Sequence, residues 1–113
     1  MRRVEKPWGY ELIFAETDLY VGKILHIKKG ERLSLQYHNK KDETFYVSKG
    51  VLKLEMGNQK EPLTETHMRV GDSQRIEPGQ VHRVTAIETC DLFEVSSTEL
   101  DDVVRLEDDY ERD

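Results

Sequence analysis

Hydrophobic and polar residues alternate in short runs along this chain of 113 residues. In the run Val51–Met56, Lys53 and Glu55 separate apolar residues at every second position. Because successive side chains of a strand point to opposite faces, this alternation predicts a half-buried β-strand. Thr44–Val47 and Leu92–Val95 are rich in β-branched and aromatic residues and are predicted to be strands as well. The pattern therefore indicates a protein built from short strands.

Turn-forming residues recur at short, regular intervals between these runs. They are Pro7–Gly9, Gly22, Lys29–Gly30, Asn39–Lys41, Gly50, Gly57–Asn58, Gly71–Asp72 and Pro78–Gly79. Short strands at this spacing predict a β-sandwich or barrel. A closed sheet suits a chain with 36% hydrophobic and 35% charged residues, because closure buries one face of every strand. We expect a single domain, with N-terminal strands over 1–22, a barrel core over 23–97 and an acidic tail over 98–113.

The negative charge of the chain is concentrated near its C-terminal end. The net charge is −6, and residues 98–113 hold eight acidic residues and two arginines, so the remainder is neutral. A chain without a basic surplus is not expected to bind nucleic acid non-specifically. The acidic segment fits either a solvated tail or a functional element.

The apolar runs are too short for a membrane span. The longest runs of large apolar residues, such as Leu12–Phe14, have three residues, whereas a transmembrane helix needs about 20. After Met1–Arg3 the chain continues with charged and turn residues, so a secretory signal is not expected either. The one cysteine, Cys90, cannot form an internal disulfide and is expected to be a small buried hydrophobe. These features predict a cytoplasmic protein.

Four side chains that can bind a metal ion are spaced so that they can meet inside such a barrel. Gln36 and His38 lie two positions apart, and on a strand they point to the same face. A polar turn follows, and Glu43 then opens the next predicted strand. Downstream, the Pro78–Gly79 turn precedes His82 at the start of another strand. Two imidazoles, a carboxylate and an amide oxygen suit one divalent ion of zinc, manganese, iron, cobalt or nickel.

The spacing of these residues resembles the two motifs of the cupin superfamily. The first motif matches at Gly30, Gln36, His38, Glu43 and Gly50, with Gln36 in place of the usual histidine, and the second matches at Gly71, Gly79 and His82. Glu77 and Ala86 stand where the second motif commonly has proline and asparagine. The resemblance implies an all-β fold, a single small cupin β-barrel of the double-stranded β-helix, jelly-roll type. His26 and His67 match neither motif and are expected to be structural or solvent-facing.

Three segments resemble the cupin domain of type II phosphomannose (mannose-6-phosphate) isomerases, which is usually fused behind a mannose-1-phosphate guanylyltransferase. They are Lys6–Glu11, Gly30–His38 and Val104–Tyr110, and they occur in the family's order. Nucleotide transfer is not expected, because nothing in this chain has the length or the glycine-rich loop of the guanylyltransferase half. The resemblance implies a sugar-phosphate isomerase in which the metal polarises the substrate carbonyl while an enediol forms. It also implies a homodimer, because small cupins commonly pair through their sheets.

The ligand hairpin departs from the pattern of that family. Its members usually have two histidines and an arginine where this chain has Asn39, Lys40 and Lys41. A lysine keeps the charge but loses the two-pronged geometry that suits phosphate. We expect Arg32 and Lys41 to meet the substrate phosphate, and the alternative for each is a solvated surface charge. No general base is identified: Glu94 lies on a strand expected to line the barrel, yet we expect its carboxylate to point outward.

Two other functions fit the same residues. His38, His82 and Glu43 alone form the two-histidine, one-carboxylate triad that holds ferrous iron in oxygenases. The departures in the ligand hairpin also fit a non-catalytic module that binds a metal or a sugar.

Overall fold

The computed structural model describes residues 1–110, and these residues form strands without any helix. The strands are β1 (Arg2–Lys6), β2 (Gly9–Glu16), β3 (Val21–Ile27), β4 (Leu35–Tyr37), β5 (Glu43–Lys49), β6 (Val51–Gly57), β7 (Thr64–Arg69), β8 (Ser73–Ile76), β9 (Val81–Ala86), β10 (Cys90–Ser96) and β11 (Val104–Glu107). The three strands predicted from the pattern of apolar residues are confirmed as parts of β5, β6 and β10. None of the described residues belongs to a helix long and apolar enough to cross a membrane.

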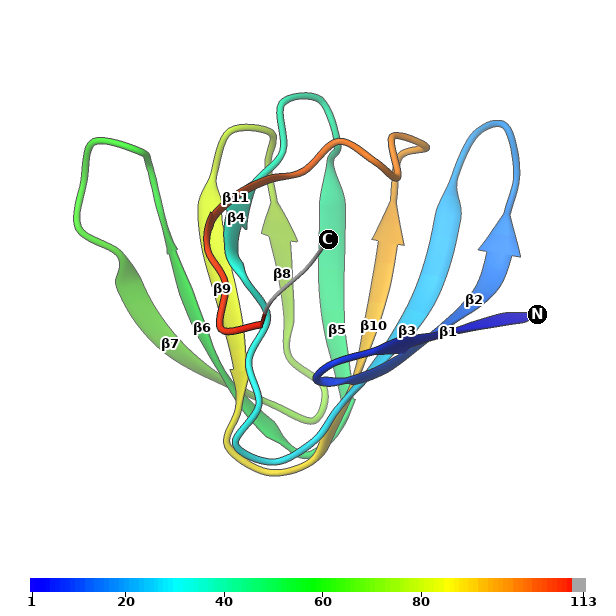
Figure 1. Ribbon diagram of the computed structural model, residues 1–113, viewed down its shortest axis with the longest axis horizontal. Helices are drawn as coiled ribbons and strands as arrows, with labels where there is room; N and C mark the ends of the chain where they lie inside the picture. The colour runs from blue at the N-terminus through cyan, green and yellow to red at the C-terminus, as the bar shows by residue number, and fades with distance from the viewer. Residues whose placement is uncertain (111–113) are drawn as a thin grey trace.

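The strands form two antiparallel sheets that face each other. One sheet has six strands in the order β1-β2-β3-β10-β5-β8, and the other has five in the order β11-β4-β9-β6-β7. Strands far apart in sequence are direct neighbours, as β3 is to β10 and β4 to β9. Figure 1 shows the sheets splayed apart at one end and close together at the other. This arrangement is a double-stranded β-helix, and it confirms the predicted fold class.

The core fills the space between the two sheets. In β6, Leu52 and Leu54 are 0% and 2% exposed, while the charged residues between them lie on the other face, as the alternation predicts. Phe45 and Leu92 from the opposite sheet complete the same apolar cluster. Cys90 is fully buried within it, which confirms the prediction of a small buried hydrophobe.

The face of strand β10 that is buried is not the face that its hydrophobic pattern predicts. Phe93 and Val95 are more apolar as a pair than Leu92 and Glu94, so the pattern favours an outward Glu94. Instead Leu92 and Glu94 point into the barrel, with exposed fractions of 0% and 5%, while Val95 is 53% exposed. Phe93 packs against two other aromatic rings on the outer face of the sheet. The expectation of an outward, solvated Glu94 carboxylate was therefore wrong.

The acidic segment is held against the barrel over its described part. Strand β11 pairs with β4, so that Arg105 lies opposite Gln36. The side chain of Tyr110 packs against the core cluster and donates a hydrogen bond to Glu31. Residues 98–110 are thus part of the folded domain, and residues 111–113 of the predicted tail lie outside the described residues.

Candidate metal centre

Three of the predicted ligands meet between the two sheets. His38 follows β4, Glu43 is the first residue of β5, and His82 lies in β9. The Nε2 atoms of His38 and His82 each lie 3.4 Å from a different carboxylate oxygen of Glu43. One candidate ligand atom from each residue lies within 4.8 Å of the other two, and all three side chains are buried. We call His38, Glu43 and His82 the ligand triad.

Backbone contacts fix the two turns that carry the triad. The Gly79 N–H donates a hydrogen bond of 2.7 Å to the carbonyl oxygen of His38, and thereby ties the second turn to the first. Gly79 has a φ of 86°, a left-handed conformation that glycine adopts without steric cost. The sequence placed a turn at Pro78–Gly79, and the structure shows that this turn supports both histidines.

Asp102 holds the ligand hairpin from the acidic segment. Its carboxylate accepts hydrogen bonds from the backbone N–H groups of Asn39, Lys40 and Lys41, at 3.1, 2.6 and 2.9 Å. These three donors lower the pKa of Asp102 to about 2. No pattern in the sequence indicates this role, because one acidic residue among many in an acidic segment is not distinguished from its neighbours.

Both histidines are held in the tautomer that a metal requires. Nδ1 of His38 lies 2.5 Å from the carbonyl oxygen of Asp102, and Nδ1 of His82 lies 3.0 Å from that of Gln80. Because a carbonyl oxygen only accepts, each Nδ1 carries a proton, and Nε2 is the nitrogen that can bind a metal when the imidazole is neutral. Neither Nε2 has a hydrogen-bond partner among the described residues.

The unpartnered Nε2 atoms of the two histidines indicate that the triad fits a divalent cation. Buried polar atoms are almost always hydrogen-bonded in native proteins, so two orphaned imidazole nitrogens need an explanation. Each Nε2 faces an oxygen of the Glu43 carboxylate at 3.4 Å, a contact that is favourable when a proton or a metal ion lies between the two atoms. Burial raises the pKa of Glu43, but the two histidines and Lys41 outweigh it and hold that pKa well below its ordinary value. Metal binding displaces any proton on Nε2, and two neutral imidazoles with an ionised carboxylate are then a suitable donor set for a transition metal.

Gln36, the fourth predicted ligand, lies beside the triad. It is the direct partner of His82 across β4 and β9, and paired residues of antiparallel strands share a face. The Ser34 hydroxyl donates a hydrogen bond of 2.6 Å to the side-chain oxygen of Gln36. A second lone pair stays on that oxygen, and its use as a metal ligand remains a prediction.

Lys41 and Glu94 form a buried ion-pair chain that begins at the triad. The Lys41 Nζ lies 3.0 Å from Oε2 of Glu43 and 3.1 Å from Oε2 of Glu94, and Lys41 and Glu94 are each 5% exposed. The alternative of a solvated Lys41 is therefore wrong. Burial lowers the pKa of Lys41, but the two carboxylates outweigh it and raise that pKa. Burial and the charge of Glu43 raise the pKa of Glu94 in spite of Lys41.

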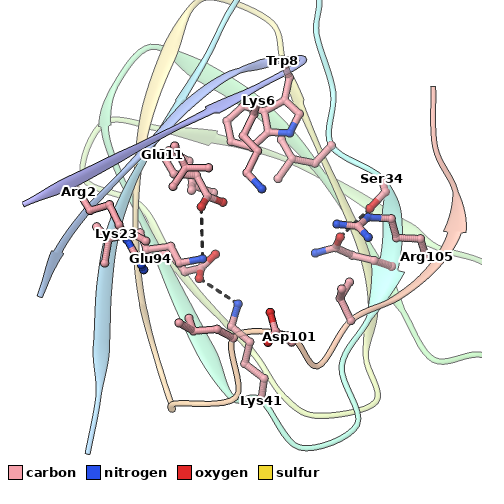
Figure 2. A pocket seen from close by; sticks show the side chains of 17 residues that line it. Arg2, Lys6, Trp8, Glu11, Lys23, Ser34, Lys41, Glu94, Asp101 and Arg105 are labelled. Carbon is pink, nitrogen blue, oxygen red and sulfur yellow. Dashed lines mark hydrogen bonds and ion pairs between the residues drawn. The ribbon is translucent and has the colours of Figure 1, made fainter. Parts of the chain in front are cut away.

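A cavity of about 330 Å³ lies next to this ion-pair chain (Figure 2). Gln36, Lys41 and Glu94 line it, as does the buried side chain of Trp8. Its basic lining residues are Arg2, Lys6, Lys23, Lys41 and Arg105, and its acidic ones are Glu11, Glu94 and Asp101. The cavity therefore carries a surplus of positive charge. The triad residues do not line it, but Gln36 and Lys41 do, and these two residues are direct neighbours of His82 and Glu43.

Arg32, the other residue expected at the phosphate, lies outside the residues that line this cavity. Its guanidinium group makes two bonds to the carboxylate of Asp109, at 2.6 and 2.8 Å. Because this contact already uses the two-pronged geometry of the arginine, a phosphate role for Arg32 remains a prediction. The other histidines lie elsewhere: His26 pairs with Asp91 at 2.7 Å, and His67 is exposed.

A double-stranded β-helix with two histidines and a carboxylate converging between its sheets defines a cupin. The sequence profile of the family described as mannose-6-phosphate isomerase C-terminal matches residues 1–108, and the chain belongs to this family.

Curated relatives of the chain are larger proteins of mannose metabolism and polysaccharide synthesis. The chain is 34% identical to the xanthan biosynthesis protein XanB of Xanthomonas campestris pv. campestris and 35% identical to a mannose-1-phosphate guanylyltransferase of Escherichia coli K12. Each alignment covers 98% of this chain but only 24% and 23% of the respective relative. The chain thus spans about a quarter of the length of these relatives.

Solved structures show the same fold at lower sequence identity. KdgF from Halomonas sp. aligns with a TM-score of 0.77 at 18% identity, covering 89% of this chain and 91% of KdgF. Oxalate decarboxylase from Lactobacillus farciminis, as its formate complex, aligns with a TM-score of 0.79 at 20% identity, covering 93% of this chain and 33% of that enzyme. At these identities the similarity supports the fold alone.

Proposed function

We propose that this protein is a metal-dependent sugar-phosphate isomerase that interconverts mannose 6-phosphate, or a similar aldose phosphate, with the corresponding ketose phosphate. The observation that carries the proposal is the buried triad, in which two Nε2 atoms without hydrogen-bond partners face one carboxylate beside a positively charged cavity. Membership in the mannose-6-phosphate isomerase C-terminal family supports the choice of substrate class.

The triad, joined by Gln36, would hold one divalent ion. Zinc, manganese, iron, cobalt and nickel all accept imidazole and carboxylate ligands, so the donor set does not select among them. When bound, such an ion supplies Lewis acidity toward the carbonyl oxygen of a substrate in the cavity. The carbonyl contacts at Nδ1 of both histidines keep the imidazoles oriented for this task.

We assign proton transfer to Glu94. Aldose–ketose isomerisation needs a base that removes a proton from the carbon beside the carbonyl and returns it to the neighbouring carbon. The Glu94 carboxylate lines the cavity, and Lys41 holds it at 3.1 Å. Its raised pKa makes it a stronger base than an ordinary carboxylate. Since the Lys41 ammonium already makes two ion pairs, we propose that Lys41 positions Glu94 and does not itself meet the phosphate.

Metal analysis combined with an isomerase assay tests this function. The purified protein is loaded with each candidate metal, and interconversion of mannose 6-phosphate and fructose 6-phosphate is measured. We expect about one metal ion per chain, and activity that depends on it. The matched control is His38→Ala with His82→Ala, which should abolish stoichiometric binding. Glu94→Gln should keep the metal and lower the rate by about 10²–10⁴-fold. Absence of interconversion with every candidate metal would contradict the proposal.

The oxygenase alternative rests on the composition of the triad: two histidines and one carboxylate converge between the sheets. Two histidines and a carboxylate with open positions suit ferrous iron. Oxygen uptake by the Fe²⁺-loaded protein on addition of a substrate, without sugar-phosphate exchange, would favour this alternative. Binding of a sugar phosphate without either reaction would favour a non-catalytic binding module.

The homodimer and the cytoplasmic location remain predictions. In support of a dimer, the outer face of the six-stranded sheet exposes Phe14, Tyr46 and Val95, at 42%, 46% and 53%. Contiguous apolar surface of this kind is common where subunits meet. Sedimentation equilibrium should give twice the 13.3 kDa chain mass, and a monomer mass would contradict the prediction.

A further inference from the structure

The charge of the cavity differs from that of the whole protein. The chain carries a net charge of −6, yet five basic and three acidic side chains line the cavity, a surplus of two positive charges. Such a concave surface concentrates anions. The cavity volume, about 330 Å³, is near the lower end for small-molecule sites, which suits a small and polar ligand.

Most of the basic residues in the cavity are already neutralised by an acidic partner. Three ion pairs account for them: Arg2 with Glu16 at 3.3 Å, Lys23 with Glu11 at 3.6 Å, and Lys41 with Glu94 at 3.1 Å. Lys6 and Arg105 are the two cavity cations that make no ion pair within residues 1–110. Asp101 also lines the cavity and carries one negative charge. Together with Lys6 and Arg105 it leaves a net charge of +1.

Strand register directs both free cations into the cavity. In β1, Arg2, Val4 and Lys6 line the cavity, whereas Arg3 and Glu5, which alternate with them, form an ion pair of 2.9 Å on the other face. Arg105 is the partner of Gln36 across β11 and β4 and therefore shares its inward face. Figure 2 shows the Lys6 ammonium and the Arg105 guanidinium group both pointing into the cavity, on walls other than the one formed by β10.

We propose that Arg105 and Lys6 form the anion-binding end of the cavity and hold the phosphate group of a small phosphorylated ligand. Arginine supplies two parallel N–H donors to a phosphate, and lysine adds a compact positive charge. This inference rests on the proposed function for the identity of the ligand, and it assigns the phosphate to residues other than Arg32 and Lys41. The phosphate lies at Arg105 and Lys6 while the reacting carbons lie near Glu94 and the triad.

Calorimetric titration of the Zn²⁺-loaded protein with mannose 6-phosphate, and separately with mannose, tests the assignment. We expect Arg105→Gln and Lys6→Gln each to weaken mannose 6-phosphate binding by roughly tenfold or more. Binding of mannose should be unchanged, and Arg105→Lys should recover part of the loss. The matched control is Arg69→Gln, which removes the same charge from an exposed position on β7. Bound zinc and the melting temperature, measured for every variant, exclude misfolding as the cause.

The outcomes separate this inference from the proposed isomerase. If the wild type binds mannose 6-phosphate without isomerising it, and Arg105→Gln loses this binding, the anion site is supported and the proposed isomerase is contradicted. Isomerase activity that is unaffected by both substitutions overturns the anion site and keeps the isomerase. The assignment would also be overturned if Arg32→Gln weakened mannose 6-phosphate binding by tenfold or more while Arg105→Gln bound it as tightly as the wild type.

Discussion

The two ends of the barrel interior are built from the same strands but carry different chemistry. In four of the strands an inward-facing residue near one end is charged or polar, and those that follow toward the other end are apolar. From the polar end to the apolar end they read Lys23, Leu25 and Ile27 in β3; Glu43, Phe45 and Val47 in β5; His82, Val84 and Ala86 in β9; and Glu94, Leu92 and Cys90 in β10. The polar end is the splayed end in Figure 1, where β5 and β9 begin.

This difference shows how a small domain can separate stability from function. Burying ions costs several kcal/mol each unless they are well paired, so the polar end contributes little to folding for its size. The apolar end removes side chains from water at about 25 cal/mol per Å² and holds the same strands together. A substitution at the polar end should therefore change metal binding, ligand binding or catalysis as well as stability, whereas one at the apolar end should change stability alone.

The largest effect is expected for Lys41→Met at the polar end. Removing this ammonium leaves Glu43 and Glu94 buried without their shared partner. Loss of one partner of a buried ion pair costs about 3–5 kcal/mol. Urea unfolding of the metal-free variant should show this loss, and saturating Zn²⁺ should recover more stability in the variant than in the wild type.

The double variant Lys41→Met with Glu94→Gln is the control for this prediction. It removes one charge of each sign, so it should be more stable than Lys41→Met alone. An unchanged unfolding free energy in Lys41→Met would mean that water reaches these carboxylates, and the contrast between the two ends would fail.

The next effect is expected for Leu92→Ala at the apolar end. Leu92 is fully buried and lies opposite both Leu25 and Val47. Removal of a buried leucine side chain costs about 2–5 kcal/mol. We expect zinc affinity to stay within a few-fold of the wild type, because the triad lies at the other end. A parallel loss of zinc affinity would show that the two ends are not independent.

The sequence predicted the fold and the triad because both depend on local patterns. Gln36 and His38 share a face through their spacing of two, and Glu43 and His82 each follow a recognisable turn. The orientation of Glu94 was missed because the outward residues of β10 are more apolar than the inward ones. Burial follows from how the sheets close, and the hydrophobic pattern of one strand does not determine that closure.

The supporting residues of the site were missed for a different reason. Asp102 contacts the hairpin more than 60 residues before it, and Arg105 enters the cavity only because β11 pairs with β4. Neither contact leaves a spacing that could be recognised within one segment. An acidic segment taken as a tail from its composition is thus the segment that holds the ligand hairpin in place.

Asp102→Asn tests that support, with a smaller expected effect. The substitution keeps the size of the side chain but replaces a charged acceptor of three hydrogen bonds with a neutral amide. Loss of a residue that orients metal ligands commonly lowers metal affinity by about 10–100-fold. Competition with a chelator measures the zinc affinity, and Asp18→Asn at an exposed position is the control with the same charge change. Equal affinities for Asp102→Asn and the wild type would exclude the supporting role.

The smallest effect concerns Cys90, whose thiol reports on the apolar end. Burial, together with the charge of Asp91, raises the pKa of Cys90 to about 11. The folded protein therefore keeps the thiol protonated where the unfolded chain would already ionise it. Because the pKa is higher in the folded state, this contribution to stability is complete below about pH 9 and is lost as the pH rises toward 11.

Reaction with a thiol reagent at pH 8 measures this protection without ambiguity, since the chain has one cysteine. The native protein should react only at the rate at which the apolar end opens. Leu92→Ala should accelerate the reaction, and Asp102→Asn should not, because it loosens the polar end. Between pH 9 and 11 the wild type should lose more unfolding free energy than Cys90→Ala, because the variant has no thiol to ionise. Fast labelling of the wild type would place the thiol in contact with solvent and contradict the closed apolar end.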